Sequence, residues 1–478
     1  MWLVLRTILL IDLLAASSAL AQTPPVSADR PWHGHGEQKI EADAKGALEF
    51  RFSIDPAKAY TLTELVDLAE SHNPETRVAW ERARAQAAAL GIARSELYPT
   101  LAAAAVSGVH RDEAYFTNRF FRQTIEHYQA ELHLNYTVFD FGARAGRIDA
   151  AKAEVLAANF AFNDTHRTII YQIEQFYYQL LNALGQEDAA RVSLSNAQAV
   201  QRSAEERLNN GLATLPDVLE ARSSTAQAEY ELQSAQGARQ IAAGNLTTAL
   251  GTSATATISV QPLEELPIPD SVSDSADVVI DRALAQRPDL MQQVAGIRAA
   301  NAGVREARAA FYPSLHFIAE PIAESLHGLQ QQFPWGNTAG LLGGMGFRLN
   351  WTVFDGGARK SRLAREEANV HEAEAQVHVS RDQIANEVWA AYSNLNTALR
   401  QRQAATALLE AASRSYDAAL ESYGYGLRNL LDVTAAQRTL AQARSTDVLA
   451  RTQVLGALAN LAFRAGDSIQ PNSARPAP

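Results

Sequence analysis

The residues of this chain whose types and spacing could do chemistry lie in two short segments. They read Gly211-Leu-Ala-Thr-Leu-Pro-Asp217 and Gly426-Leu-Arg-Asn-Leu-Leu-Asp432. In each, a glycine permits a sharp reversal of the chain, and an aspartate follows where a helix would begin. A carboxylate in the first helical turn favours the positive helix end, which is a sufficient structural reason for both aspartates. The segments predict two tight turns between helices, at which Leu215, and Leu430 or Leu431, can bury.

No catalytic constellation accompanies these turns. The sequence shows no paired carboxylates, nucleophile elbow, zinc-ligand spacing or phosphate loop in a credible context. His127 and His133 flank a predicted strand singly, as pore-lining or surface histidines do. The His33-Gly34-His35 triplet has no partner ligands nearby and reads as part of a solvated linker. We expect no enzymatic activity, no metal and no cofactor.

Composition narrows the class of protein. The 478 residues are 47% hydrophobic and 20% charged, which suits a folded chain better than a disordered tail or a multispan helical bundle. The 42 Lys and Arg against 53 Asp and Glu give a net charge of −11, the wrong sign for a nucleic-acid partner. With no cysteine, the chain can form neither disulfides nor a lipid anchor through cysteine.

The termini carry export and linker signals. Residues 1–21 are expected to be a signal peptide, because Arg6 precedes an apolar stretch and small residues end it at Ala21. Residues 22–57 are polar and irregular and predict an N-terminal linker, and residues 467–478 predict a C-terminal tail.

An internal duplication organises the chain between these ends. His72-Asn-Pro-Glu75 recurs as Gln286-Arg-Pro-Asp289, and Asn135-Tyr-Thr-Val-Phe-Asp140 recurs as Asn350-Trp-Thr-Val-Phe-Asp355. The motifs return in the same order and spacing, so the first repeat spans 58–251, the second spans 275–466, and a proline-containing linker over 252–274 joins them.

Each repeat changes its hydrophobic period in the same order. Helical patterns over 62–97 and 278–311 precede strand pairs over 100–140 and 314–355, of which 130–138 and 345–353 alternate apolar and polar residues. The segments 111–126 and 321–344 between the strands predict long surface loops. Helical periodicity then runs over about 142–210 and 357–425 to the tip turns 211–217 and 426–432, and a return helix follows each turn.

Four strands with one apolar face cannot close a membrane barrel, whose smallest size is about eight strands. Open edges are not tolerated in lipid, so the chain must assemble, as two copies with eight strands or three with twelve. Polar residues on the other face suit a wide, water-filled lumen and favour three copies: Glu131, His133, Arg348 and Asn350. An ordinary soluble β-sandwich is the alternative. Tyr136 and Trp351, at equivalent places near the strand ends, favour a membrane interface instead.

At this point the repeated motifs resemble a known family. The plan of helix, strand pair, long helix and return helix, with Asn-Tyr-Thr-Val-Phe-Asp-Phe-Gly-Ala-Arg and its copy, is similar to the TolC family of outer-membrane efflux channels over about 57–466. The resemblance implies a mixed α+β membrane protein: a homotrimer with a twelve-stranded transmembrane β-barrel in the outer membrane of a Gram-negative bacterium, continuous with a long periplasmic α-helical coiled-coil barrel.

The same resemblance implies a function and partners. The chain would be the outer-membrane exit duct of a tripartite efflux or type I secretion system, passively conducting substrates from a periplasmic adaptor and an inner-membrane pump, and bound to outer-membrane lipid but not to nucleic acid. A non-channel trimeric coiled-coil stalk, such as an adhesin, is the alternative. The transported substrate is left open.

Roles for the tip residues also come from the resemblance. Asp432 would contribute one carboxylate per subunit to a ring at an iris-like gate, whereas Ala435 stands where some relatives carry a second acidic residue. Arg428 would pair with Asp217 of the adjacent subunit, with Tyr423 as a hydrogen-bond partner. The residues expected to meet the adaptor are Gly211, Leu212, Leu215, Gly426, Leu427 and Leu430.

Overall fold

The computed structural model describes residues 37–47, 52–116, 118–272, 274–330 and 337–467. The predicted signal peptide 1–21, the His33–His35 triplet and residues 468–478 of the predicted tail lie outside the described residues. The chain divides into two units, Met1–Ile54 and Asp55–Pro478. In the first unit, helix α2 (Glu37–Ala47) occupies part of the segment predicted to be irregular, because its Glu, Lys and Ala residues are strong helix formers.

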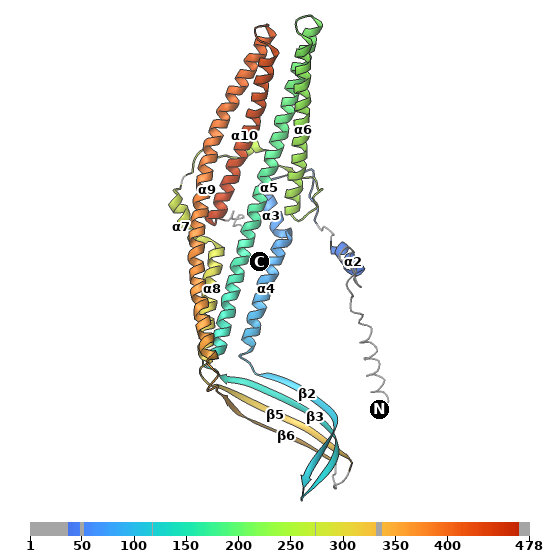
Figure 1. Cartoon of the computed structure of the whole chain (residues 1–478), viewed down its shortest axis with the longest axis vertical. Helices are drawn as coiled ribbons and strands as arrows, with labels where there is room; N and C mark the ends of the chain where they lie inside the picture. The colour runs from blue at the N-terminus through green and yellow to red at the C-terminus, as the bar shows by residue number, and fades with distance from the viewer. Residues whose placement is uncertain (1–36, 48–51, 117, 273, 331–336, 468–478) are drawn as a thin grey trace. The chain divides into compact units, whose positions relative to one another are not determined.

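In the second unit, each repeat contributes two short and two long helical segments (Figure 1). The first repeat holds α3 (Leu62–His72), α4 (Pro74–Ser95), α5 (Ala143–Asn209) and α6 (Leu215–Ala249). The second holds α7 (Ala276–Gln286), α8 (Pro288–Ala309), α9 (Ala358–Gly424) and α10 (Leu430–Ala465). No helix within the described ranges combines the length and the apolar character that crossing a membrane requires.

Each first helical pattern is two helices and not one, so the prediction of single helices over 62–97 and 278–311 is wrong. Asn73 and Arg287 stand before prolines, and both adopt extended backbone, at ψ 127° and 123°. Asn73 then caps two helices, since its Oδ1 accepts from the Glu75 amide at 2.7 Å and its Nδ2 donates to the Ala249 carbonyl at 2.9 Å. Proline at the first helical position therefore sets a corner that also ties the end of α6.

The strands form one antiparallel sheet in the order β2-β3-β5-β6 (Figure 1). They span Thr100–Phe116, Arg119–Phe139, Ser314–Gln330 and Thr338–Asn350. A separate pair, β1 (Ala59–Tyr60) and β4 (Ser259–Val260), is parallel, and a short 3₁₀ helix covers Leu263–Glu265. In the sheet, β2 and β6 are the two edges, and β3 and β5 join the two repeats.

The long loop predicted over 111–126 is wrong, because pairing continues from Thr100↔Asn135 to Phe116↔Arg119. Both faces of the outer hairpin carry polar side chains, so the alternation that marks a half-apolar strand disappears although the backbone pairing persists. Glu113 and Arg122, directly opposite each other, form a 2.8 Å ion pair there. Likewise β5 runs to Gln330, well into the loop predicted over 321–344, and β6 ends at Asn350, so Trp351 lies just past its strand.

One face of the sheet is apolar over a band of the strands. Its alternate positions within 101–107, 128–138, 315–325 and 339–349 carry no charged side chain. Large residues stand exposed on it, among them Met345 at 81% and Phe347 at 70%. The band on β3 is as long as the roughly 9–11 residues that a tilted transmembrane strand needs.

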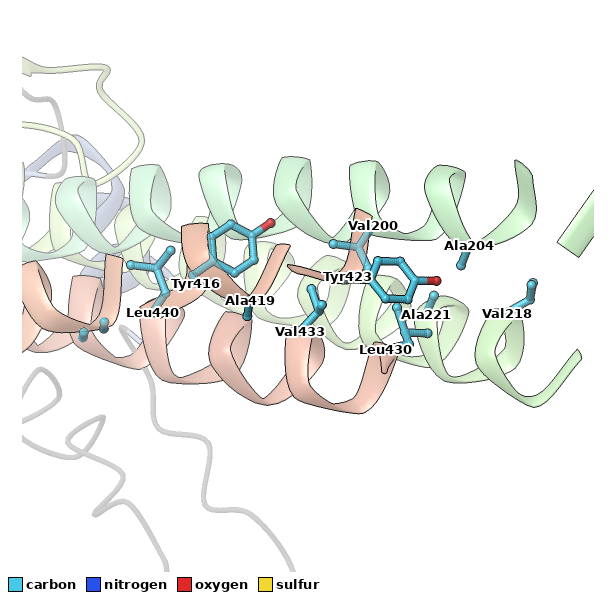
Figure 2. Packing of buried hydrophobic residues seen from close by; sticks show 12 residues of the cluster. Val200, Ala204, Val218, Ala221, Tyr416, Ala419, Tyr423, Leu430, Val433 and Leu440 are labelled. Carbon is cyan, nitrogen blue, oxygen red and sulfur yellow. The ribbon is translucent and has the colours of Figure 1, made fainter. Parts of the chain in front are cut away.

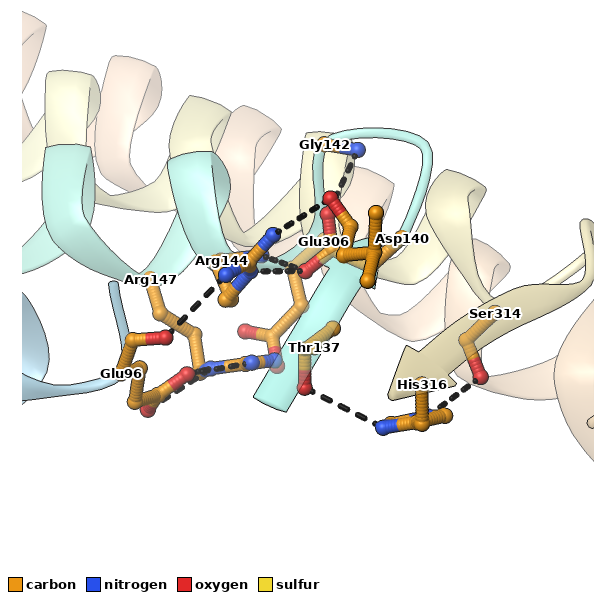
Figure 3. A network of polar contacts seen from close by, with 10 residues as sticks. Glu96, Thr137, Asp140, Gly142, Arg144, Arg147, Glu306, Ser314 and His316 are labelled. Carbon is orange, nitrogen blue, oxygen red and sulfur yellow. Dashed lines mark hydrogen bonds and ion pairs between the residues drawn. The ribbon is translucent and has the colours of Figure 1, made fainter. Parts of the chain in front are cut away.

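A repeated corner joins the sheet to the long helices (Figure 3). Gly142 adopts φ 94°, and Asp140 accepts hydrogen bonds from the Gly142 amide at 3.2 Å and from the Arg144 amide and Nε at 2.9 and 3.0 Å. The second repeat builds the same corner from Asp355, Gly357 and Arg359. The repeated Asp-x-Gly-x-Arg motif is thus the device that turns a strand into a helix.

Candidate functional site

The two tip turns lie at the end of the second unit opposite the sheet, where α5 reverses into α6 and α9 into α10 (Figure 1). Gly211 and Gly426 adopt left-handed backbone at φ 73° and 75°, which glycine does without steric cost. Each turn is closed by a backbone hydrogen bond into the preceding helix. The Leu212 amide donates to the Arg207 carbonyl at 2.7 Å, and the Leu427 amide donates to the Ser422 carbonyl at 2.9 Å. The predicted reversals therefore stand at Gly211 and Gly426.

The two turns cap their return helices differently. At the first turn, Asp217 Oδ2 accepts from the Thr214 amide at 2.9 Å and from its hydroxyl at 2.7 Å. These bonds, the backbone one foremost, lower the pKa of Asp217. At the second turn, the cap is Asn429, whose Oδ1 accepts from the Asp432 amide at 2.9 Å. Within the described part of the chain, the Asp432 carboxylate has no hydrogen bond or ion pair, whereas the bonds of Asp217 engage Oδ2 and leave Oδ1 for another group.

Tyr423 is only 5% exposed and lies in the buried hydrophobic cluster drawn in Figure 2, which we call the tip core. The Arg207 guanidinium lies over its ring, 4.7 Å from the ring centre. Arg207 Nη1 donates to the carbonyls of Tyr423 at 3.1 Å and Gly424 at 3.3 Å. Burial raises the pKa of Tyr423, which Arg207 opposes and Asp217 reinforces. The Tyr423 hydroxyl has no hydrogen-bond partner among the described residues.

Arg207 is the tip residue that the sequence analysis missed. Its only signal is a basic residue in the last turn of α5, which is the position from which a side chain can reach the closing carbonyls of a helix. Here those carbonyls belong to the neighbouring helix α9. Arg207 thus joins the two tip turns of one chain.

Arg428 and Asp217 are not joined by an ion pair within the chain, as far as the described residues extend. The predicted pair concerns adjacent subunits and stays a prediction. Three of the tip leucines face outward: Leu212, Leu215 and Leu427 are 67%, 60% and 78% exposed. Leu215 therefore does not bury at the reversal.

Leu430 is 2% exposed and packs with Val433 and Leu440 in the tip core (Figure 2). The prediction that Leu430 meets a partner is therefore wrong. It points into the pair formed by α9 and α10, and the adjacent Leu431, 62% exposed, takes the outer position.

The aromatics predicted at a membrane interface also differ in setting. Tyr136 lies within β3 opposite Phe317, and Trp351, 59% exposed, follows β6 and donates from Nε1 to the Phe311 carbonyl at 3.2 Å. No three His, Asp or Glu side chains within the described ranges gather closely enough to hold a metal ion.

Comparisons with known proteins agree with this architecture. The family model described as outer membrane efflux protein matches residues 65–252 and 279–467, one match in each repeat. Protein CyaE of Bordetella pertussis is 27% identical over 405 residues, 83% of each chain. Outer membrane protein OprJ of Pseudomonas aeruginosa is 26% identical, over 90% of this chain and 89% of its own.

Among solved structures, the CmeC outer membrane channel of Campylobacter jejuni superposes with a TM-score of 0.73 at 21% identity, covering 85% of each chain. The likeness bears out the predicted fold class, a β-barrel joined to a long α-helical barrel and built from a duplicated chain. Since the family model matches both repeats, well over half of the sequence, this chain belongs to the outer membrane efflux protein family and serves as an efflux channel of the bacterial outer membrane.

Proposed function

We propose that three copies of this chain close one channel, which receives its cargo from a periplasmic adaptor and an inner-membrane pump. The observation that carries the proposal is the four-stranded sheet, which has two unpaired edges, β2 and β6, and one apolar face. Lipid tolerates no open sheet edge, and three copies supply the twelve strands that enclose a wide lumen. The non-channel stalk is not favoured, since such a stalk has no use for a sheet with a lipid-compatible face.

The tips form the gate in this proposal. The Asp432 carboxylates of three subunits lie around one axis, where like charges favour cations and resist anions. Arg428 of each subunit pairs with Asp217 of the next, beside Tyr423. As an exposed pair it contributes about 0–1 kcal/mol, weak enough for an adaptor that binds the exposed Leu212, Leu215 and Leu427 to break.

Substitution of Arg428 by serine tests the gate. R428S removes the cation of the proposed latch, so we expect a higher single-channel conductance of the purified trimer in planar bilayers. The matched control is R414S. Arg414 is also an exposed arginine, near the tip end of α9, but it pairs with Glu410 on its own helix. Equal conductance of R428S and R414S would remove the latch from the account.

A further inference from the structure

Four of the chain's eleven histidines share one face of the sheet. Directly opposite residues of antiparallel strands, and residues two apart on one strand, lie on the same face. Gly108 is opposite His127, which places His110 with His127, and Thr137 is opposite His316. His133 follows at even spacing on β3. We call this surface the histidine face.

The histidine face is the one turned away from lipid. The opposite face carries the uncharged band with Met345 and Phe347 exposed, and acyl chains accept that face alone. In the trimeric barrel of the proposed function, on which this step rests, the histidine face therefore lines the water-filled lumen.

Each histidine meets defined neighbours. His133 lies between two carboxylates, with Nε2 at 2.9 Å from Glu131 Oε1 and Nδ1 at 3.7 Å from Glu320 Oε1. His127 Nε2 lies 3.4 Å from Glu324 Oε1. The pairs with Glu320 and Glu324 join β3 to β5, whereas Glu131 lies on β3 with His133. The β2 residues opposite the two histidines, Ala102 and Gly108, add no charge.

The other two histidines have different neighbours. His110 meets the His127 ring edge-on at 6.0 Å between centres. His316 is within hydrogen-bond distance of the hydroxyls of Thr137 at 3.2 Å and Ser314 at 3.0 Å (Figure 3). On β6, its directly opposite residue is Arg348.

From these positions we infer that the histidine face is an ion-selectivity filter whose sign follows pH. By register the face also holds Asp112 and Arg119 toward the end of the β2–β3 hairpin. With neutral imidazoles, its four carboxylates and two guanidinium groups leave two negative charges per chain, and with four imidazolium groups the face carries two positive charges. Cationic solutes are favoured in the first state and anionic solutes in the second, because a wall of one sign raises the local concentration of the opposite ion. Imidazole is the group that changes charge in the range about pH 5–8.

Reversal potentials of the full-length trimer test the filter. The trimer is inserted in a planar bilayer under a KCl gradient, with about 10 mM salt on the dilute side, where the Debye length of roughly 30 Å reaches across a wide lumen. We expect the sign of the potential to show K⁺ preference at about pH 7.5 and Cl⁻ preference at about pH 5, on either side of the ordinary imidazole pKa.

The matched variants each replace four histidines. H110Q/H127Q/H133Q/H316Q is expected to keep its cation preference at both pH values. The control, H72Q/H166Q/H371Q/H378Q, replaces histidines of the helices and is expected to change sign as the parent does. The Asp432 carboxylates are the same in both, so a difference between them reports the barrel alone. If the first variant forms no SDS-stable trimer, H127Q/H133Q and H110Q/H316Q are measured separately, and each is expected to lose part of the shift.

Two results would overturn the filter: a parent channel whose selectivity does not change with pH, or a barrel variant that shifts as far as the helix control. A chain that forms no conducting trimer at either pH would contradict the proposed function itself, and the filter with it. A trimer that conducts ions but whose selectivity does not change with pH contradicts the filter alone and leaves the proposed function standing.

Discussion

Two buried carboxylates on α5 stand in opposite surroundings. Glu187, 7% exposed, lies 2.8 Å from Arg191 Nη2 and 2.7 Å from Arg239 Nε. Glu174, 6% exposed, has no ion pair within the described residues, and burial alone raises its pKa to about 7. Its charge in turn adds to the burial that raises the pKa of Tyr178.

Replacing Glu174 by glutamine tests this assignment. Since the folded pKa of about 7 exceeds the unfolded value near 4.5, the native chain holds a proton that the unfolded chain loses, and stability falls as pH rises between these values. E174Q removes the cost of burying that charge, so we expect stabilisation of up to about 3 kcal/mol above pH 7, which shrinks as the pH falls below 7 and is absent below about pH 4.5. Thermal unfolding across pH measures it.

E187Q is the matched control. It removes the carboxylate that pairs with Arg239 and leaves Arg191 with Asp188 alone, so it should destabilise at neutral pH. Stabilisation by E187Q, or an E174Q effect that does not vary with pH, would contradict the contrast between the two sites.

Sequence reasoning reached some tip residues and not others, for physical reasons. The reversals at Gly211 and Gly426 were predictable, because the preference for glycine in left-handed backbone is local and does not depend on which helices pack nearby. Arg207 and Leu430 were not, because their roles depend on which helix packs beside them. A leucine at the start of α10 reads the same whether it turns outward or toward Tyr416 and Tyr423.

At the scale of elements, the strand-to-helix corner carries the join between sheet and helices. Asp140 is largely buried and accepts three hydrogen bonds there, two of them from Arg144. D140A leaves these donors unpaired, so we expect a loss of about 1–3 kcal/mol of stability, measured as a lower dissociation temperature of the trimer.

D149A serves as its control. Asp149, on the helix α5 that follows the corner, makes only partly exposed pairs with Lys152 and Arg305, both at 3.0 Å, so its loss should cost no more than about 1 kcal/mol. A cost for D140A no larger than for D149A would show that the corner does not depend on its carboxylate.

The elements that sequence predicted best are those with one apolar face. The inner half of β3 and both long helices show a clear hydrophobic period, and the structure places β3, α5 and α9 there. The outer half of the β2–β3 hairpin gave no such signal, because polar residues stand on both its faces while its backbone still pairs out to Phe116 and Arg119. The breaks at Pro74 and Pro288 fell inside continuous helical patterns.

At the scale of the whole molecule, closure of the barrel requires β6 of one copy to pair with β2 of the next. The chain has no cysteine, so introduced pairs report this contact directly. With A103C on β2 and a second cysteine scanned over Leu341, Gly343, Met345 and Phe347 on β6, we expect at least one pair to give dimer and trimer bands on non-reducing gels.

The control pair is A103C/L132C. Ala103 and Leu132 face each other within one chain, so their disulfide should leave the protein at the monomer mass. Only monomers across the whole β6 scan, with a control that oxidises normally, would contradict closure by three copies.

The seam between β3 and β5 has a consequence for how such a cylinder is put together. Within one polypeptide it joins the hairpins of the two repeats, whereas the seam from β6 to β2 forms only when separate chains meet. A ring of six separate hairpins would need six contacts between molecules. When each chain carries two hairpins, three of those contacts form within a chain, at high effective concentration. Because fusion makes the β3–β5 seam a different pair of sequences from the β6–β2 seam, the two register shifts along β3 and β5 need not recur at the seam between copies.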